Sequence, residues 1–151
     1  MDSLYVLVPI RWLHILAATL AVGVPIYVRF VLMPAMQGLD DAARTTLREA
    51  SAKRWRIIVY ICIVIFLATG FYNYLVVQRW QHIVDESMKK RYHMLLGIKI
   101  LLAFAAFFIS SAVAGRSAKL ANFRTNAKMW VTVLILIGLT IIGLSAGLRY
   151  L

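Results

Sequence analysis

The sequence has one cysteine and six acidic residues, and both scarcities exclude whole classes of site. A single thiol, Cys62, forms no intrachain disulfide and supplies no multi-thiolate metal site. We expect it to pack as a small apolar side chain, as free cysteines commonly do. The long hydrophobic stretches contain no Asp or Glu, which excludes carboxylate proton relays and carboxylate-bridged di-iron centres within them. The sequence also contains no phosphate-cradling loop and no nucleophile motif.

Apolar residues, by contrast, are abundant: 62% of the chain is hydrophobic and its mean hydropathy is +0.80. Soluble domains contain about 45–50% apolar residues. Stretches at 5–35, 55–77, 92–114 and 128–148 each reach the roughly 20 residues that a helix needs to cross about 30 Å of hydrocarbon. None alternates polar with apolar residues as membrane β-strands do. The sequence therefore predicts an all-α integral membrane four-helix bundle, a single domain over 1–151 embedded in a lipid bilayer.

The formal charge of +11 results from 17 Lys and Arg residues against 6 Asp and Glu. On a soluble protein this excess would favour nucleic-acid binding, but here the cations flank the hydrophobic stretches, where they meet anionic lipid headgroups. We therefore expect no nucleic-acid partner. The positive-inside rule predicts that both termini lie outside the cytoplasm, because one side carries nine cations and the other six. The nine are Arg44, Arg48, Lys53, Arg54, Arg56, Arg116, Lys119, Arg124 and Lys128, and the six are Arg11, Arg79, Lys89, Lys90, Arg91 and Arg149.

The connections between the stretches also have recognisable patterns. The segment 37–54 has Asp40 and Asp41 near its start and cations towards its end, as the helix dipole prefers. This pattern favours an amphipathic helical turn on the membrane surface that serves as a linker. The segment 78–91 places His82 at the opposite membrane interface.

Small and polar residues within the stretches indicate how the helices pack. Pro25 predicts a kink in the first helix. Thr69 and Asn73, one turn apart, are placed to form hydrogen bonds across helices. Gly143 and Gly147 form a small-xxx-small stripe in the last helix, which permits close contact within the bundle or homodimerisation. Of these two uses we expect contact within the bundle.

Ionisable residues inside membrane spans are energetically costly, so each is a functional hypothesis. The first span contains Arg11, His14 and Arg29, and the third begins with His93 and contains Lys99. At about 100° per residue, Arg11 and Arg29 share one face of their helix and His14 lies roughly 60° from it. We expect that face to point into the bundle.

His14 and Lys99 lie at similar predicted depths, roughly 13 and 10 Å from the same membrane side. His93 lies nearer to that interface, so the three side chains are placed to line one cavity that opens outward. A purely structural alternative has His14 bonding a neighbouring helix, Lys99 reaching the surface and His93 lying among headgroups.

This set of side chains suits a tetrapyrrole. Neutral imidazole is a common ligand of haem iron and of other transition metals, and bundle cores hold such cofactors. Arg11 and Lys99 supply the cations that haem propionates need. The residues therefore predict a tetrapyrrole site in which His14 and His93 are candidate metal ligands, with His93 or Lys99 as the partner of His14 or as a propionate contact. A copper site would instead combine imidazole with thioether sulfur, for which Met94 beside His93 is available.

Three segments carry a resemblance to a known family. They read RWLHILAATLAVGVPIYVRFVLMPAM (11–36), RWRIIVYICIVIFLATGFYNYL (54–75) and LLGIKILLAF (95–104), followed by AGRSA. Together they resemble the copper-resistance protein D family of four-helix bacterial inner-membrane proteins. More distantly, the chain is similar to the short membrane protoporphyrinogen oxidases, which bind haem b.

The resemblance implies a multi-pass protein of the bacterial inner (cytoplasmic) membrane. The oxidases have a helix-one histidine and a helix-three lysine, which correspond to His14 and Lys99. Their histidine two residues before the lysine is here Gly97, and the family's tryptophan and second glycine after the helix-one histidine are here Ala21 and Val22. We therefore expect a haem b-binding protein with a redox or electron-transfer role. The alternatives are copper uptake or resistance, and a non-catalytic subunit that packs through the last helix in a larger membrane complex.

Overall fold

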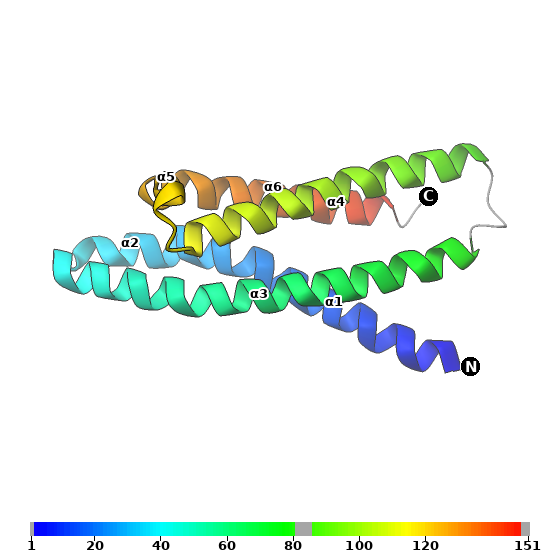
Figure 1. The fold of residues 1–151 in the computed structure, drawn as a ribbon, viewed down its shortest axis with the longest axis horizontal. Helices are drawn as coiled ribbons and strands as arrows, with labels where there is room; N and C mark the ends of the chain where they lie inside the picture. The colour runs from blue at the N-terminus through cyan, green and yellow to red at the C-terminus, as the bar shows by residue number, and fades with distance from the viewer. Residues whose placement is uncertain (1, 81–85, 149–151) are drawn as a thin grey trace.

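The computed structural model shows an all-α chain whose long helices run side by side along one axis (Figure 1). It describes the backbone of residues 2–80 and 86–148, and the side chains of residues 5–75 and 90–148. The predicted all-α fold is confirmed. The elements are α1 (Asp2–Tyr27), the π-helical turn η1 (Val28–Leu32), α2 (Met33–Ala35), η2 (Met36–Gly38), α3 (Asp41–Trp80), α4 (Glu86–Ala114), η4 (Ala118–Leu120), α5 (Ala121–Thr125) and α6 (Ala127–Gly147).

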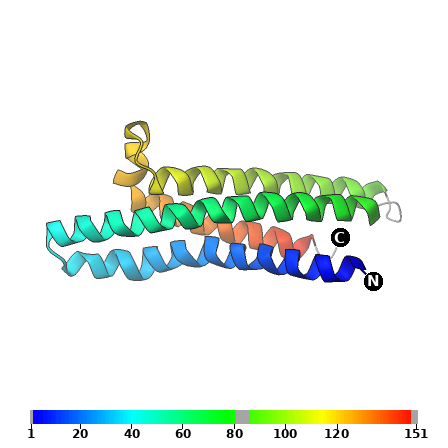
Figure 2. The ribbon, with the colours of Figure 1, turned by 60° about the horizontal axis from the view of Figure 1, so that its bottom comes forward.

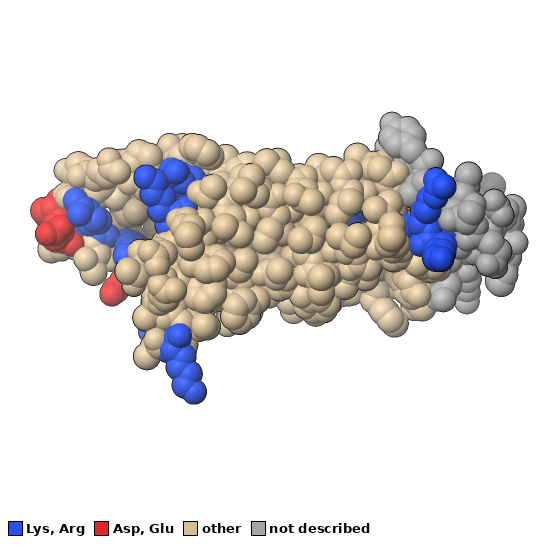
Figure 3. Space-filling view, turned by 90° about the horizontal axis from the view of Figure 1, so that it is seen from above, with Lys and Arg blue, Asp and Glu red and all other residues tan. Residues whose placement is uncertain are grey.

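Four helical stretches are long and apolar enough to cross a membrane. They are Tyr5–Gly38, Asp41–Leu75, Lys90–Ala114 and Ala127–Gly147. Large apolar side chains such as Phe71 and Leu101 are exposed on their outer faces, as expected where helices meet lipid rather than water. On the face drawn in Figure 3, Lys and Arg lie mainly near the two ends of the molecule and leave a long, largely uncharged middle. The chain is therefore a multi-pass membrane protein.

The bundle has a square arrangement. Helix α1 packs against α3 and α6, and α4 packs against the same two helices, so α1 and α4 occupy diagonal corners. The start of α1, the end of α3, the start of α4 and the end of α6 lie at one end of the bundle, which we call the terminal end (Figures 1 and 2). The opposite end carries α2, the start of α3 and α5, and we call it the α5 end.

The segment 37–54 differs from its prediction. Helix α3 begins at Asp41 and runs for 40 residues without a break. Its start is capped by Asp40, whose Oδ1 accepts a hydrogen bond from the Ala43 amide at 2.8 Å. The predicted helical character is confirmed, but a separate surface linker is wrong, because no Gly or Pro occurs between Asp41 and the span to end the helix. His82 lies outside the described residues.

Helix α1 bends along its length (Figure 1). Two prolines, Pro9 and Pro25, lie inside it and lack the amide donor that an α-helix uses. The π-helical turn η1 begins three residues after Pro25 and widens the helix there. The helix thus departs from α-helical geometry shortly after Pro25, while a kink at Pro25 itself stays a prediction.

The prediction that Gly143 and Gly147 of α6 make contacts within the bundle is wrong. A Cβ at Gly138 would lie 2.8 Å from Val22 Cγ2 of α1, whereas a Cβ at Gly143 or Gly147 would meet nothing within 4 Å. Gly138 is buried and the other two are exposed. Five residues separate Gly138 from Gly143, which turns the helix by about 140° and places the predicted stripe on the outer face. The bundle contact therefore passes through Gly138.

Candidate functional site

His14 is the polar centre of the α1–α3 contact. Its side chain is half-buried, and its Nδ1 atom lies 2.7 Å from Oγ1 of Thr69 on α3. Thr69 is only 6% exposed, so this hydrogen bond lies inside the bundle. The prediction that Thr69 bonds across helices is confirmed. Asn73, predicted to do the same, forms no such bond to another described residue.

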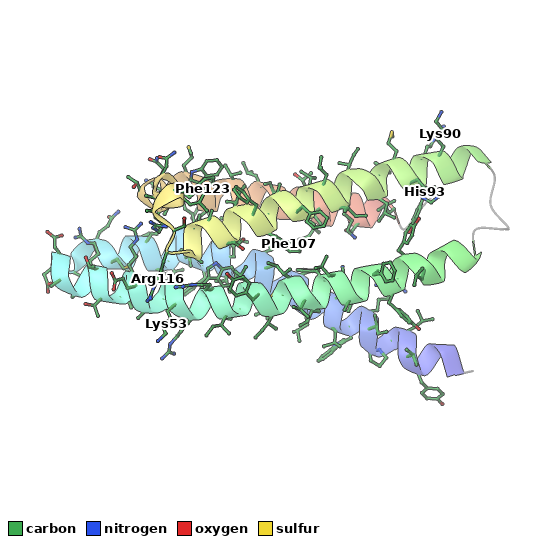
Figure 4. The ribbon with its side chains drawn as sticks, in the orientation of Figure 1. Lys53, Lys90, His93, Phe107, Arg116 and Phe123 are labelled. Carbon is green, nitrogen blue, oxygen red and sulfur yellow. The ribbon has the colours of Figure 1, made fainter. Side chains whose placement is uncertain are left out.

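One aromatic side chain of α3 contacts the imidazole, and it leads to a second on α4. The His14 and Phe66 rings meet edge to face, with centroids 5.1 Å apart and an interplanar angle of 82°. Phe66 in turn contacts Phe107 of α4 at 5.7 Å, and Figure 4 shows Phe107 in the region between α4 and α3. His14 therefore has a polar partner at one nitrogen and an apolar wall beside its ring.

Lys99 approaches His14 from the opposite corner of the bundle. It lies on α4, diagonal to α1, and its side chain is partly buried. Its ammonium group is close enough to His14 for its charge to act on the imidazole. Within the described part of the chain, Lys99 takes part in no ion pair. His14 and Lys99 are both partly buried, on helices at diagonal corners of the bundle. Their similar depth in the membrane stays a prediction.

His93 does not join this pair. Its side chain is exposed near the start of α4, at the terminal end, and its ring contacts that of Tyr92 at 5.8 Å (Figure 4). Six residues separate His93 from Lys99, which places the two about 120° apart around the helix. The sequence predicted that His14, Lys99 and His93 line one cavity. The structure contradicts this for His93, which lies outside the interior surface.

The two arginines of the first span lie in different surroundings. Arg11 is exposed, so the prediction that its face points into the bundle is wrong for this residue. Arg29 lies in η1, is partly buried, and donates from Nε to Oγ1 of Thr132 on α6 at 3.1 Å. Arg29 therefore faces α6 inside the bundle, whereas Arg11, five turns earlier, is exposed.

Metal-ligating side chains are sparse. In the described ranges no group of three or more His, Cys, Asp or Glu residues is arranged to hold a metal ion. Met94, the thioether beside His93, is 60% exposed. Cys62 is 4% exposed and packs near the Ala17 carbonyl, which confirms that it is a buried small side chain. The residues that the structure does bring together are His14, Thr69 and Lys99.

Comparisons of the chain with protein-family models, with curated proteins and with solved structures found no match. The likeness to the copper-resistance protein D family therefore stays a prediction from the sequence, and the case for a function depends on the geometry around His14.

Proposed function

We propose that this chain is a haem b-binding membrane protein with a redox or electron-transfer role. The observation that supports this most is the placement of His14 inside the bundle, with one ring nitrogen held by Thr69 and a lysine across from it. Imidazole is a frequent axial ligand of haem iron, and bundle interiors are common haem sites. An intramembrane histidine with a defined hydrogen-bond partner suits that role better than it suits a lipid-facing anchor.

Each residue of the site has a distinct part in this proposal. His14 would hold the haem iron through Nε2, since Nδ1 is engaged by Thr69. Lys99 would supply a cation for a propionate group. Phe66, backed by Phe107, would place an apolar ring beside the imidazole. A bound haem supplies a one-electron iron couple, whose potential depends on axial ligation, hydrogen bonding and burial.

Lys99 suits the proposed site better than His93 does. Lys99 is partly buried on the interior of the bundle, whereas His93 and Arg11 are exposed. In this arrangement Arg11 contacts a propionate only if that group reaches the outer edge of the bundle. The residues therefore fit a haem with one firm imidazole ligand and one interior cation.

The test is an absorption spectrum of the detergent-purified protein, expressed with adequate haem, with metal analysis of the same sample. We expect a Soret band and about one iron per chain in the wild type. The band should be lost in His14→Ala and retained in His93→Ala, which serves as the matched control. Circular dichroism confirms that each variant keeps its helix content.

Other outcomes overturn the proposal. A well-folded protein without a Soret band excludes haem binding. About one copper per chain in that sample would favour copper handling, the second hypothesis from the sequence. Neither haem nor copper, together with co-purifying membrane proteins, would favour a non-catalytic subunit.

A further inference from the structure

We infer that Thr69 is a positioning residue that holds the neutral His14 imidazole in one tautomer, with the proton on Nδ1 and the lone pair free on Nε2. The tautomer follows from hydrogen bonding alone. Its use, to present Nε2 to a metal, rests on the proposed haem function. The relevant atoms are Thr69 Oγ1, His14 Nδ1 and the Ile65 carbonyl oxygen.

The Thr69 hydroxyl has two partners and a single hydrogen. Its Oγ1 lies 2.6 Å from the Ile65 carbonyl oxygen, one turn earlier in α3, and 2.7 Å from His14 Nδ1. A carbonyl oxygen only accepts, so the hydroxyl donates its hydrogen to Ile65. Towards His14 the hydroxyl oxygen is then an acceptor, and Nδ1 is the donor.

The other threonines of this chain form the same hydrogen bond along their own helices. Each donates its hydroxyl to the carbonyl four residues earlier, as helical threonines often do. They are Thr19, Thr45, Thr46, Thr125, Thr132 and Thr140.

Thr132 repeats the arrangement of Thr69 with a partner whose role is certain. It donates to the Lys128 carbonyl at 2.9 Å and contacts Arg29 Nε at 3.1 Å. A guanidinium group only donates, so Thr132 must accept from the second helix while it donates along its own. Thr69 stands in the same relation to α1, with His14 in the place of Arg29.

The consequence for His14 follows from the chemistry of imidazole. A neutral ring carries one proton, so a proton on Nδ1 leaves Nε2 without one. Metal-bound histidines commonly use this division, in which one nitrogen donates to a fixed acceptor and the other ligates the metal. The bond to Thr69, together with the edge contact to Phe66, also limits rotation of the ring.

Nitrogen-15 NMR of the haem-free protein tests the tautomer directly. Of the three histidines, His82 and His93 are replaced by Gln so that only His14 contributes signals. We expect a protonated Nδ1 and an unprotonated Nε2, assigned through couplings to the ring hydrogens. Thr69→Ser keeps the hydroxyl and should keep this pattern, whereas the isosteric Thr69→Val should move a large fraction of the proton to Nε2. Thr140→Val, which loses only a back-bond, is the control.

A protonated Nε2 in the wild type overturns the inference, as does an unchanged pattern in Thr69→Val. Haem titration then separates the tautomer from the proposed function. We expect Thr69→Val to weaken haem binding about 10–100-fold, the usual effect of removing a group that orients a ligating histidine, and Thr69→Ser to retain it. The predicted tautomer without haem binding supports the inference and excludes the haem proposal. If the haem-free ring is instead protonated on Nε2 and the protein still binds haem, the haem proposal is supported and the inference about Thr69 is overturned.

Discussion

Gly138 of α6 lies directly against Val22 of α1, and a Cβ at Gly138 would come within 2.8 Å of Val22 Cγ2. Val22 is β-branched and has one preferred side-chain rotamer in a helix, so it cannot easily turn away. We expect Gly138→Ala to destabilise the bundle by about 1–3 kcal/mol, the usual cost of overpacking. Thermal unfolding in detergent, followed by circular dichroism, measures this effect as a lower midpoint.

Two variants make that measurement specific. Gly143→Ala adds the same methyl group on the exposed face of α6, where nothing lies within 4 Å, and should change stability by less than about 0.5 kcal/mol. Adding Val22→Ala to Gly138→Ala should recover part of the loss, because the two sites are in contact. Equal stability of Gly138→Ala and wild type would show that α1 and α6 do not approach closely here.

The hydrogen bond between Arg29 and Thr132 should contribute measurably to the contact between η1 and α6. Thr132→Val removes the acceptor from the partly buried Nε of Arg29. We expect a loss between about 0.6 and about 1.7 kcal/mol, which are the average and the largest value for hydrogen bonds between membrane helices. Thr140→Val is the matched control, since Thr140 bonds only along its own helix. Similar unfolding midpoints for both variants would contradict a role for the Arg29 contact.

Arg124 forms hydrogen bonds that stabilise the connection between α4 and α6. Its Nη1 donates to the carbonyls of Gly115 at 3.2 Å and Ser117 at 2.8 Å, and Arg48 of α3 donates to the Arg124 carbonyl. Arg124→Gln should therefore allow this connection to open more often. We expect trypsin to cleave after Arg116 and Lys119 at least about fivefold faster, which corresponds to a loss of about 1 kcal/mol.

Mass spectrometry of the fragments follows that cleavage site by site. Lys128→Gln removes an exposed cation at the same end of the bundle and should leave both rates unchanged. A connection held mainly by other contacts would be cut at the same rate in Arg124→Gln as in the wild type.

Cys62 should report unfolding of the bundle. It is the only thiol, it is 4% exposed, and its Sγ lies 3.9 Å from the Ala17 carbonyl at the α1–α3 contact. A membrane-permeable thiol reagent should modify it only as the helices separate, so the labelling midpoint should match the circular dichroism midpoint. Rapid, complete labelling of the native protein would contradict this burial, and Cys62→Ala gives the background signal.

The candidate site was only partly predictable from the sequence. His14 and Lys99 stood out because ionisable groups are expensive in a membrane, and their spacing from the helix ends gave similar depths. Thr69 was expected to bond across helices, but nothing in its own helix named His14 as its partner. The sequence also did not predict that His93 and Arg11 are exposed. The sequence of one helix does not specify which neighbouring helix covers each of its faces.

The sequence by itself determined that this is an all-α membrane protein with four spans. The hydrocarbon of the bilayer requires each span to be helical, because every backbone polar group in lipid must be paired within its own helix. Only the tertiary structure decided that Gly138 rather than Gly143 meets α1, and that Thr69 holds His14. Those choices depend on how each helix is rotated and bent against its neighbours. Because nearly every face of these helices is apolar, their own hydrophobic pattern specifies that rotation only weakly, and packing between helices settles it.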